Sequence, residues 1–194
     1  MVYEAGEAII IDPGCFDDSE KERLKAFLSQ EQLRPTRLIN THCHLDHIYG
    51  NAFVKETYNI PLEIPPDEEP MLASADSMAT AFGAPAPQSP AADHYIREGD
   101  RVKVGNTELE VLLTPGHSPG HIALFNHEQS YILSADVLFQ GGIGRTDLPG
   151  GSYETLLSTI RQKLLPLGDD VIVYPGHGPA TTIGAERHQN PFLQ

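Results

Sequence analysis

Four potential metal ligands lie within six residues of this chain, in the segment THCHLDH at positions 41–47. In an extended segment, side chains alternate between two faces, so His42 and His44 point the same way and Asp46 continues that series. His47 lies where the chain must turn, and the segment has no room for the apolar pattern of a core element. The segment therefore predicts a metal site, with a chance patch of surface histidines as the alternative.

The residues just before this segment indicate where such a site would lie. Residues 36–40, with the sequence TRLIN, form a short β-branched and apolar run that is typical of a strand. The candidate ligands would then follow the end of a strand, where loops usually carry the chemistry of a protein.

A second histidine-rich loop follows a predicted hairpin. Hydrophobic residues alternate along positions 101–113 on both sides of Gly105 and Asn106, a pair that favours a two-residue turn. The hairpin leads into residues 114–121, where glycine and proline force an irregular path and present His117 at a strand end.

Two further strands also end in candidate ligands. The predicted strand at residues 131–134 leads to Asp136, and a carboxylate in such a position is costly to bury unless it is paired or bound to a metal. The predicted strand at residues 171–174 runs into the sequence PGHG, which contains His177. Candidate ligands thus recur at successive strand ends.

Bulk properties limit the class of protein. A chain of 194 residues, 40% of them hydrophobic, can bury one sizeable core, so we expect a single domain over residues 1–194. The net charge of −14 argues against nucleic acid as a partner, because such sites need a basic stripe. The sequence shows neither a membrane-spanning run nor a secretion signal, so we expect no membrane partner and a cytoplasmic location.

The two cysteines, Cys15 and Cys43, do not predict a disulfide scaffold. Cys43 alternates away from His42 and His44, so we interpret it as a packing thiol. Asp12 follows an apolar strand at residues 8–11, where it would either support the metal site or cap a turn.

Other elements follow from periodicity and capping signals. Residues 19–22 have the form of a capping box, and a helix is predicted from there until Pro35 stops it. We expect further helices at 51–58, 71–82 and 153–164, strands at 61–64 and 122–125, and a loose loop at 83–92.

The candidate ligands, taken in chain order, resemble those of the metallo-β-lactamase superfamily over nearly the whole chain. The sequences GGIGRTD at 141–147 and ERHQNPFL at 186–193 look most like the short glyoxalase II-like, or hydroxyacylglutathione hydrolase-like, enzymes that lack a C-terminal helical domain. The resemblance implies a mixed α/β fold, an αββα sandwich of two mixed sheets flanked by helices.

The resemblance also implies two divalent metal ions. Imidazole and carboxylate ligands suit zinc and leave an open position for water, with iron or manganese as alternatives. Two ions sharing a water would make hydroxide available near neutral pH, and Asp46 would orient this nucleophile and help manage its proton. By similarity, the first ion would be held by His42, His44 and His117, the second by Asp46, His47 and His177, and Asp136 would bridge them.

The expected reaction is hydrolysis of a small-molecule thioester such as a 2-hydroxyacylglutathione. The alternative enzyme class is a persulfide dioxygenase that holds one iron through the positions of His42, His117 and Asp136. Hydrolysis of β-lactams is disfavoured because lactamases of this fold do not use a bridging carboxylate like Asp136, and RNA processing is disfavoured by the acidity and length. A non-catalytic metal-binding protein is the third class.

Two features depart from the family pattern. The family usually has glycine before the bridging aspartate, where this chain has Ala135, so the backbone there is expected to be slightly altered. The family also begins with an additional strand before the segment that matches residues 2–14. Its absence here implies either a truncated N-terminus or a first sheet that has lost a strand.

Several residues near the motifs are expected to have other roles. Arg145 and Asp147 are interpreted as a structural pair, with contact between Arg145 and an anionic substrate as the alternative. His188 and Asn190 are expected to seal the back of the fold. Histidines outside the ligand positions are interpreted as surface or packing residues: His94, His121, His127 and His188.

Overall fold

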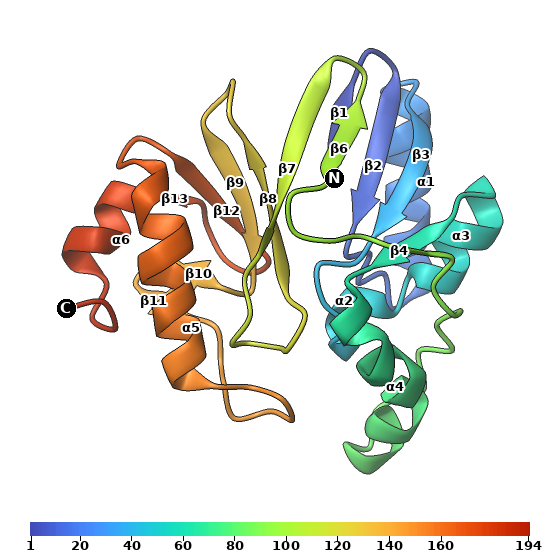
Figure 1. The fold of residues 1–194 in the computed structure, drawn as a ribbon. Coiled ribbons are helices and arrows are strands. Elements are labelled where there is room, and N and C mark those ends of the chain that lie inside the picture. The colour runs from blue at the N-terminus through green and yellow to red at the C-terminus, as the bar shows by residue number, and fades with distance from the viewer. The chain divides into compact units, whose positions relative to one another are not determined.

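The computed structural model describes residues 1–194, which form two compact units. The first unit comprises Met1–Ile96 together with Lys103–Thr107, and the second comprises Arg97–Val102 together with Glu108–Gln194. Each unit is built on one mixed β-sheet with helices (Figure 1). None of the helices has the length and apolar composition needed to cross a membrane. The single domain expected over residues 1–194 stays a prediction.

The first sheet has the strand order β1-β2-β3-β4-β5. The pairing of β1 with β2 is antiparallel, and the other pairs are parallel. The predicted strands at 8–11, 36–40 and 61–64 are confirmed to within two residues at each end. The strands are β1 (Val2–Glu4), β2 (Glu7–Ile11), β3 (Arg34–Ile39), β4 (Leu62–Ile64) and β5 (His94–Tyr95).

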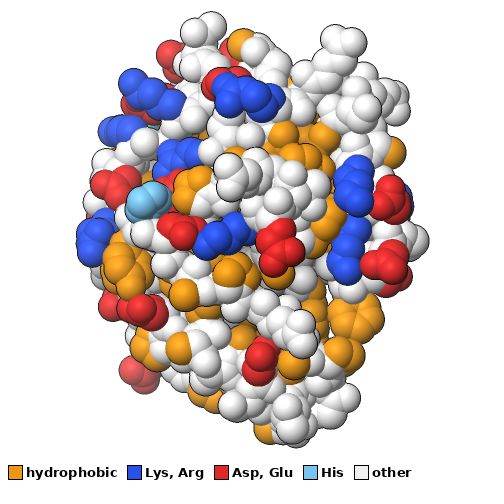
Figure 2. Space-filling model, turned by 90° about the vertical axis from the view of Figure 1, so that its right-hand side faces the viewer, with side chains coloured by type: hydrophobic (Ala, Val, Ile, Leu, Met, Phe, Trp, Pro, Cys, Tyr) orange, Lys and Arg blue, Asp and Glu red, His pale blue; other side chains and the backbone are white.

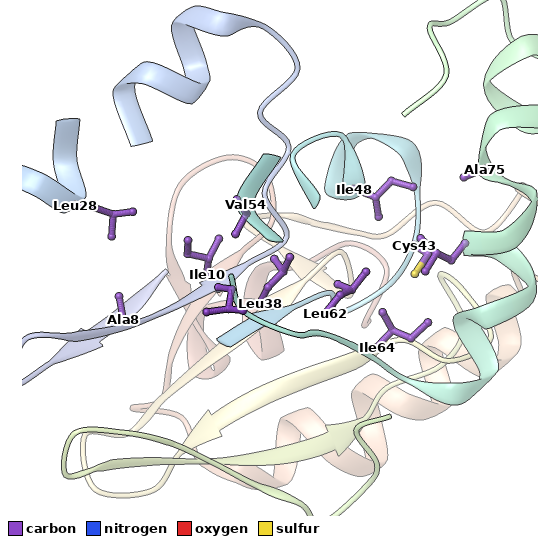
Figure 3. Packing of buried hydrophobic residues seen from close by; sticks show 12 residues of the cluster. Ala8, Ile10, Leu28, Leu38, Cys43, Ile48, Val54, Leu62, Ile64 and Ala75 are labelled. Carbon is purple, nitrogen blue, oxygen red and sulfur yellow. The ribbon is translucent and has the colours of Figure 1, made fainter. Parts of the chain in front are cut away.

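The helices of the first unit share one apolar core with its sheet. Leu28, Ile48, Val54 and Ala75 come from four different helices and belong to the same buried cluster as Leu38 of β3 (Figure 3). Burying such side chains supplies the main driving force for folding this unit. The helices are α1 (Asp18–Gln30), α2 (Leu45–Ile48), α3 (Asn51–Tyr58), the short 3-10 helix η1 (Pro66–Glu68) and α4 (Glu69–Ala81).

The start of α1 differs from the prediction. The capping box uses Asp17 and Glu20: Asp17 Oδ1 accepts from the Glu20 backbone N–H at 2.9 Å, and Glu20 Oε2 accepts from the Asp17 N–H at 3.3 Å. Ser19 instead donates its hydroxyl to Asp17 Oδ1 at 2.7 Å. The same spacing of capping residues therefore occurs twice in this stretch, and the earlier one, with a carboxylate at the N-cap, begins the helix.

The second sheet has the strand order β13-β12-β9-β8-β7-β6. The β9–β12 pair is parallel, whereas β7–β8, β8–β9 and β12–β13 are antiparallel, so this sheet is also mixed. The predicted hairpin is confirmed, because β6 and β7 are neighbours joined by a turn at Gly105 and Asn106. The strands are β6 (Arg101–Val104), β7 (Thr107–Leu113), β8 (Ile122–Asn126), β9 (Tyr131–Ala135), β12 (Ile172–Pro175) and β13 (Thr181–Thr182), with a separate pair β10 (Leu138–Phe139) and β11 (Gly142–Ile143).

Helices of the second unit pack on its sheet through a second apolar cluster. Leu156, Ile160 and Ile183 lie in this cluster with Ile132 of β9 and Val173 of β12. The helix predicted at 153–164 is present, but its second half is a π-helix. The helical segments are α5 (Tyr153–Thr159), the π-helix η2 (Ile160–Leu164), the 3-10 helix η3 (Leu165–Leu167) and α6 (Ile183–Gln189).

Candidate metal centre

The first set of candidate ligands lies in the first unit, directly after β3. The ring centroids of His42 and His44 are 4.8 Å apart, and those of His42 and His47 are 4.1 Å apart. All three histidines are buried. The predicted convergence of these side chains is therefore present. Asp46 lies in α2 instead of continuing an extended segment, and its side chain is 58% exposed, with Oδ2 3.6 Å from His47 Nε2.

Asp12, at the end of β2, has both of the roles that the sequence left open. Its backbone adopts a left-handed conformation with φ 47°, as at a turn. Its Oδ1 accepts from the Thr41 backbone N–H at 2.7 Å, and its Oδ2 lies 2.5 Å from the Thr41 hydroxyl and 3.2 Å from His47 Nδ1. A carboxylate on one ring nitrogen directs the other toward a metal, so Asp12 supports His47 as a ligand.

Hydrogen bonds also select the nitrogen that His42 presents. The Thr41 hydroxyl donates to Asp12, so it can accept from His42 Nδ1, which lies 3.1 Å away. This places the proton of His42 on Nδ1 and leaves Nε2 as the nitrogen with a lone pair for a metal ion. Ligand atoms of Asp12, His42 and His47 lie within 4.8 Å of one another, a grouping that could hold a metal ion.

Buried polar residues that the sequence did not single out hold this ligand segment. Asn40 donates to the carbonyl of His47 at 3.1 Å and accepts from Asn51 at 2.7 Å. Glu68, fully buried at the end of η1, accepts from the Cys43 backbone N–H at 2.9 Å. Burial, and then the nearby Glu68 and Asp12 carboxylates, raise the pKa of the Cys43 thiol well above its usual value. Cys43 is thus a packing thiol inside the apolar cluster, as expected (Figure 3).

The second set of candidate ligands lies in the second unit, at three strand ends. Asp136 follows β9, His117 lies in the loop after β7, and His177 follows β12. Asp136 Oδ2 is 3.7 Å from His117 Nε2 and 3.5 Å from His177 Nε2. Bonds of about 2.0–2.2 Å to one tetrahedral ion would separate two ligand atoms by about 3.3–3.6 Å. At 3.5 and 3.7 Å, both separations are longer than direct hydrogen bonds and within or close to this range, so Asp136 could share an ion with each histidine.

The segment around Gly144 holds this second set in place. The carbonyl of Arg145 lies 2.8 Å from His117 Nδ1, which directs His117 Nε2 toward Asp136. A Cβ atom on Gly144 would lie 1.9 Å from the carbonyl oxygen of Asp136 and 3.1 Å from His117 Nδ1. Only glycine fits at this position without moving a candidate ligand.

Ala135 precedes Asp136 in the chain, and His121 contacts the Asp136 backbone. Ala135 has a φ of 40°, so the chain keeps the left-handed backbone that favours glycine there, although it carries a methyl group. His121 was interpreted as a surface or packing residue, and it is fully buried, with Nε2 accepting from the Asp136 backbone N–H at 3.2 Å.

The residues predicted to have roles other than metal binding differ in burial and in partners. Arg145 and Asp147 form a two-contact ion pair, with both nitrogen–oxygen distances 2.8 Å, and Arg145 lowers the pKa of Asp147 to about 2. Asn190 is buried and donates to the carbonyl of Gly142 at 3.0 Å. His188 is exposed, so it does not seal the fold as expected, and Glu186 takes that place by bonding Gly141, Thr181 and Asn190. His94 and His127 are exposed.

Two mixed sheets flanked by helices, with histidine and aspartate groups at strand ends, define an α/β protein equipped to bind metal. The family model described as the metallo-beta-lactamase superfamily matches residues 1–177. This chain belongs to that superfamily and is one of its metallo-hydrolases.

Similar proteins agree on this fold. Hydroxyacylglutathione hydrolase GloC of Haemophilus influenzae is 43% identical over 188 residues, which cover 96% of this chain and 87% of that protein. The crystal structure of BLEG-1 B3 metallo-beta-lactamase matches this chain with a TM-score of 0.89 and 39% sequence identity. The match covers 99% of this chain and 91% of the other. The structure of TTHA1623 in a di-iron-bound form is also 39% identical, with a TM-score of 0.85 and coverage of 94% and 88%. The expected fold class is confirmed.

Proposed function

We propose that this chain is a binuclear metal-dependent hydrolase that cleaves a thioester, with a 2-hydroxyacylglutathione as the substrate type. The observation that carries this function is the 43% identity to a hydroxyacylglutathione hydrolase over 96% of the chain. The candidate ligands gathered within each unit, such as His42 with His47 and Asp136 with His117, support it.

The proposed centre draws on both ligand sets. One ion would bind His42, His44 and His117, the other would bind Asp46, His47 and His177, and Asp136 would bridge them. When bound, the ions would lower the pKa of a shared water and polarise the thioester carbonyl. Zinc suits this donor set, and the di-iron form of the TTHA1623 relative makes iron the main alternative.

The residues of the chain would orient the reactants and move protons. The carboxylate of Asp46, at the exposed start of α2, would orient the attacking water and accept its proton. The Asp12 carboxylate would keep the proton of His47 on Nδ1, so that His47 Nε2 stays a ligand throughout the reaction. The thiolate would depart as the carbon–sulfur bond breaks, and the proton that Asp46 took from the water could then pass to it.

We propose a small-molecule thioester as the substrate partner, with no nucleic acid or membrane partner, in a cytoplasmic setting. On the face drawn in Figure 2, acidic and basic side chains are interspersed with apolar ones, and no continuous basic stripe crosses it. This distribution supports a partner other than a nucleic acid backbone.

The first test is metal content, measured on protein purified without chelator, together with turnover of a 2-hydroxyacylglutathione and oxygen uptake on a persulfide. We expect about two ions per chain, thioester cleavage and no oxygen uptake. A single iron with persulfide-dependent oxygen uptake would replace this function with a dioxygenase. Stable metal content without any turnover would favour the non-catalytic class.

A second candidate, β-lactam hydrolysis, is favoured by the similarity to BLEG-1 B3 metallo-beta-lactamase. The same preparation should therefore be assayed with a chromogenic β-lactam. Turnover of the β-lactam at a higher kcat/KM than the thioester would reverse the order of the two candidates.

A matched pair of histidine substitutions tests the ligand assignment. The side chains of His177 and His127 are 57% and 59% exposed, but only His177 lies beside Asp136. We expect His177→Ala to lose bound metal and to lower kcat at least about 100-fold. Loss of a residue that only supports a ligand costs about 10–100-fold. His127→Ala should keep both properties, and equal effects of the two changes would contradict the assignment.

A further inference from the structure

We propose that His121 is a positioning residue, which fixes Asp136 relative to His117 so that both can bind the same metal ion. This role deepens the proposed function and rests on it. It also extends the sequence interpretation, in which His121 has no part in the site.

His121 closes the loop that carries His117. The backbone N–H of Thr114 donates to the carbonyl of His121 at 2.6 Å, so residues 114 and 121 form the base of the loop. Inside the loop, the N–H of Gly116 donates to the carbonyl of Ser118 at 3.1 Å. His117 therefore lies at the tip of a short loop whose base is His121.

The ring of His121 has a defined pattern of donors and acceptors. Its Nε2 faces the backbone N–H of Asp136 at 3.2 Å and must accept, because a backbone N–H can only donate. The ring proton therefore lies on Nδ1, which is 2.9 Å from the Thr114 hydroxyl oxygen. His121 and Thr114 are both fully buried, so these contacts are shielded from water.

The peptide group between Ala135 and Asp136 is held at both ends. Its carbonyl, on Ala135, accepts from the Gly176 N–H at 2.9 Å, and its N–H, on Asp136, donates to His121. Gly176 precedes His177 in the chain, whereas His121 closes the loop that carries His117. One peptide group therefore joins the three strand ends that present His117, Asp136 and His177.

These two hydrogen bonds matter because the backbone departs from strand geometry at Ala135. This residue, at the end of β9, has a φ of 40°, and the N–H of the next residue, Asp136, donates to His121 Nε2. His121 is therefore an acceptor that holds this N–H. Without it, the buried N–H would lose this acceptor, and Asp136 would be free to shift.

Two substitutions of similar size separate positioning from packing. In His121→Gln, the side-chain oxygen can reach the place of Nε2 and accept from Asp136. In His121→Asn, the shorter side chain can reach only Thr114. We expect zinc affinity, measured by competition with a chromogenic chelator, to fall about 10–100-fold in His121→Asn and to stay near the wild-type value in His121→Gln.

Urea unfolding of the metal-free variants measures how far each substitution destabilises the fold. A merely structural role would lower the stability of both variants without separating their zinc affinities. Equal zinc affinity in the two variants would overturn the positioning role, even if both are less stable. Wild-type protein that binds no zinc, iron or manganese would instead overturn the proposed function, and this role with it.

A second pair keeps the test decisive if His121→Asn does not fold. Thr114→Val removes the hydroxyl that holds His121 Nδ1, and Thr114→Ser keeps it. We expect weaker zinc binding in Thr114→Val and near-normal binding in Thr114→Ser. Equal binding by the folded members of this pair would contradict the role of His121.

Discussion

Asp12 Oδ2 lies 3.2 Å from His47 Nδ1, although the two residues are separated by 35 positions in the sequence. The same carboxylate accepts from the backbone N–H and the hydroxyl of Thr41. A single residue at the end of β2 therefore fixes the start of the ligand segment and one of its ligands. This contact joins the end of one strand to the loop that follows its parallel neighbour.

We expect Asp12→Asn to lower zinc affinity about 10–100-fold with little change in fold, because asparagine tolerates the left-handed backbone but accepts with only one side-chain atom. Chelator competition would measure the affinity. Asp18→Asn is the matched control, because the Asp18 side chain is 98% exposed in α1. If the two variants bound zinc equally, Asp12 would serve only to form the turn after β2 and would not support His47.

Gly144 supports a prediction based on space. A Cβ at Gly144 would collide with the Asp136 carbonyl, whereas a Cβ at Gly142 would lie 3.9 Å from the nearest side-chain atom, Phe139 Cβ. We expect Gly144→Ala to lose about 1–3 kcal/mol of unfolding free energy and to bind zinc more weakly. Gly142→Ala should leave zinc binding intact. Urea unfolding and zinc titration of both variants would measure these effects, and normal zinc binding by Gly144→Ala would show that the segment can move away at no cost.

The sequence predicted the candidate ligands because their signals are local: four of them share residues 42–47, and the other three each come after an apolar strand. It also predicted most strands through their alternating or continuous apolar runs. It could not predict the contacts that orient these ligands, such as His121 with Asp136 or Glu68 with Cys43. Those pairs depend on which strand ends become neighbours, and a buried polar residue has no periodic signal.

The helix boundaries show a different limit. The capping pattern of α1 occurs twice within a few residues, and only the geometry of the chain entering the helix decides between Asp17 and Ser19. The short helix α2 was also missed, because a segment of four residues is too short for helical periodicity to be visible. As a result, Asp46 was placed on an extended segment.

At Ala135, we predict that a change to glycine stabilises the protein instead of destabilising it. A left-handed alanine costs about 1–2 kcal/mol, and glycine avoids this cost but loses about 0.4–1 kcal/mol through its freer unfolded chain. We therefore expect Ala135→Gly to stabilise the protein by up to about 1.6 kcal/mol. The control is Ala123→Gly, in regular strand β8, which should destabilise by about 0.5–1 kcal/mol. Urea unfolding at equal metal loading would compare them, and similar destabilisation by both would contradict strain at Ala135.

The last prediction concerns the charge of Asp147. The Arg145 guanidinium donates to both carboxylate oxygens at 2.8 Å and lowers the pKa of Asp147 from 3.8 to about 2. Because the folded pKa is the lower one, the pair stabilises the fold above pH 3.8, and this contribution is lost as the pH falls toward 2. Both side chains are largely exposed, so salt should weaken the pair.

Carboxyl NMR titration from about pH 5 to about pH 3 would test this pair, since an ordinary aspartate titrates near the middle of that range. We expect Asp147 to stay charged throughout in the wild-type protein and to become protonated within the range in Arg145→Gln. If Asp147 titrated with the same midpoint in both proteins, Arg145 would not be held by this pair, and its guanidinium would be available to an anionic substrate.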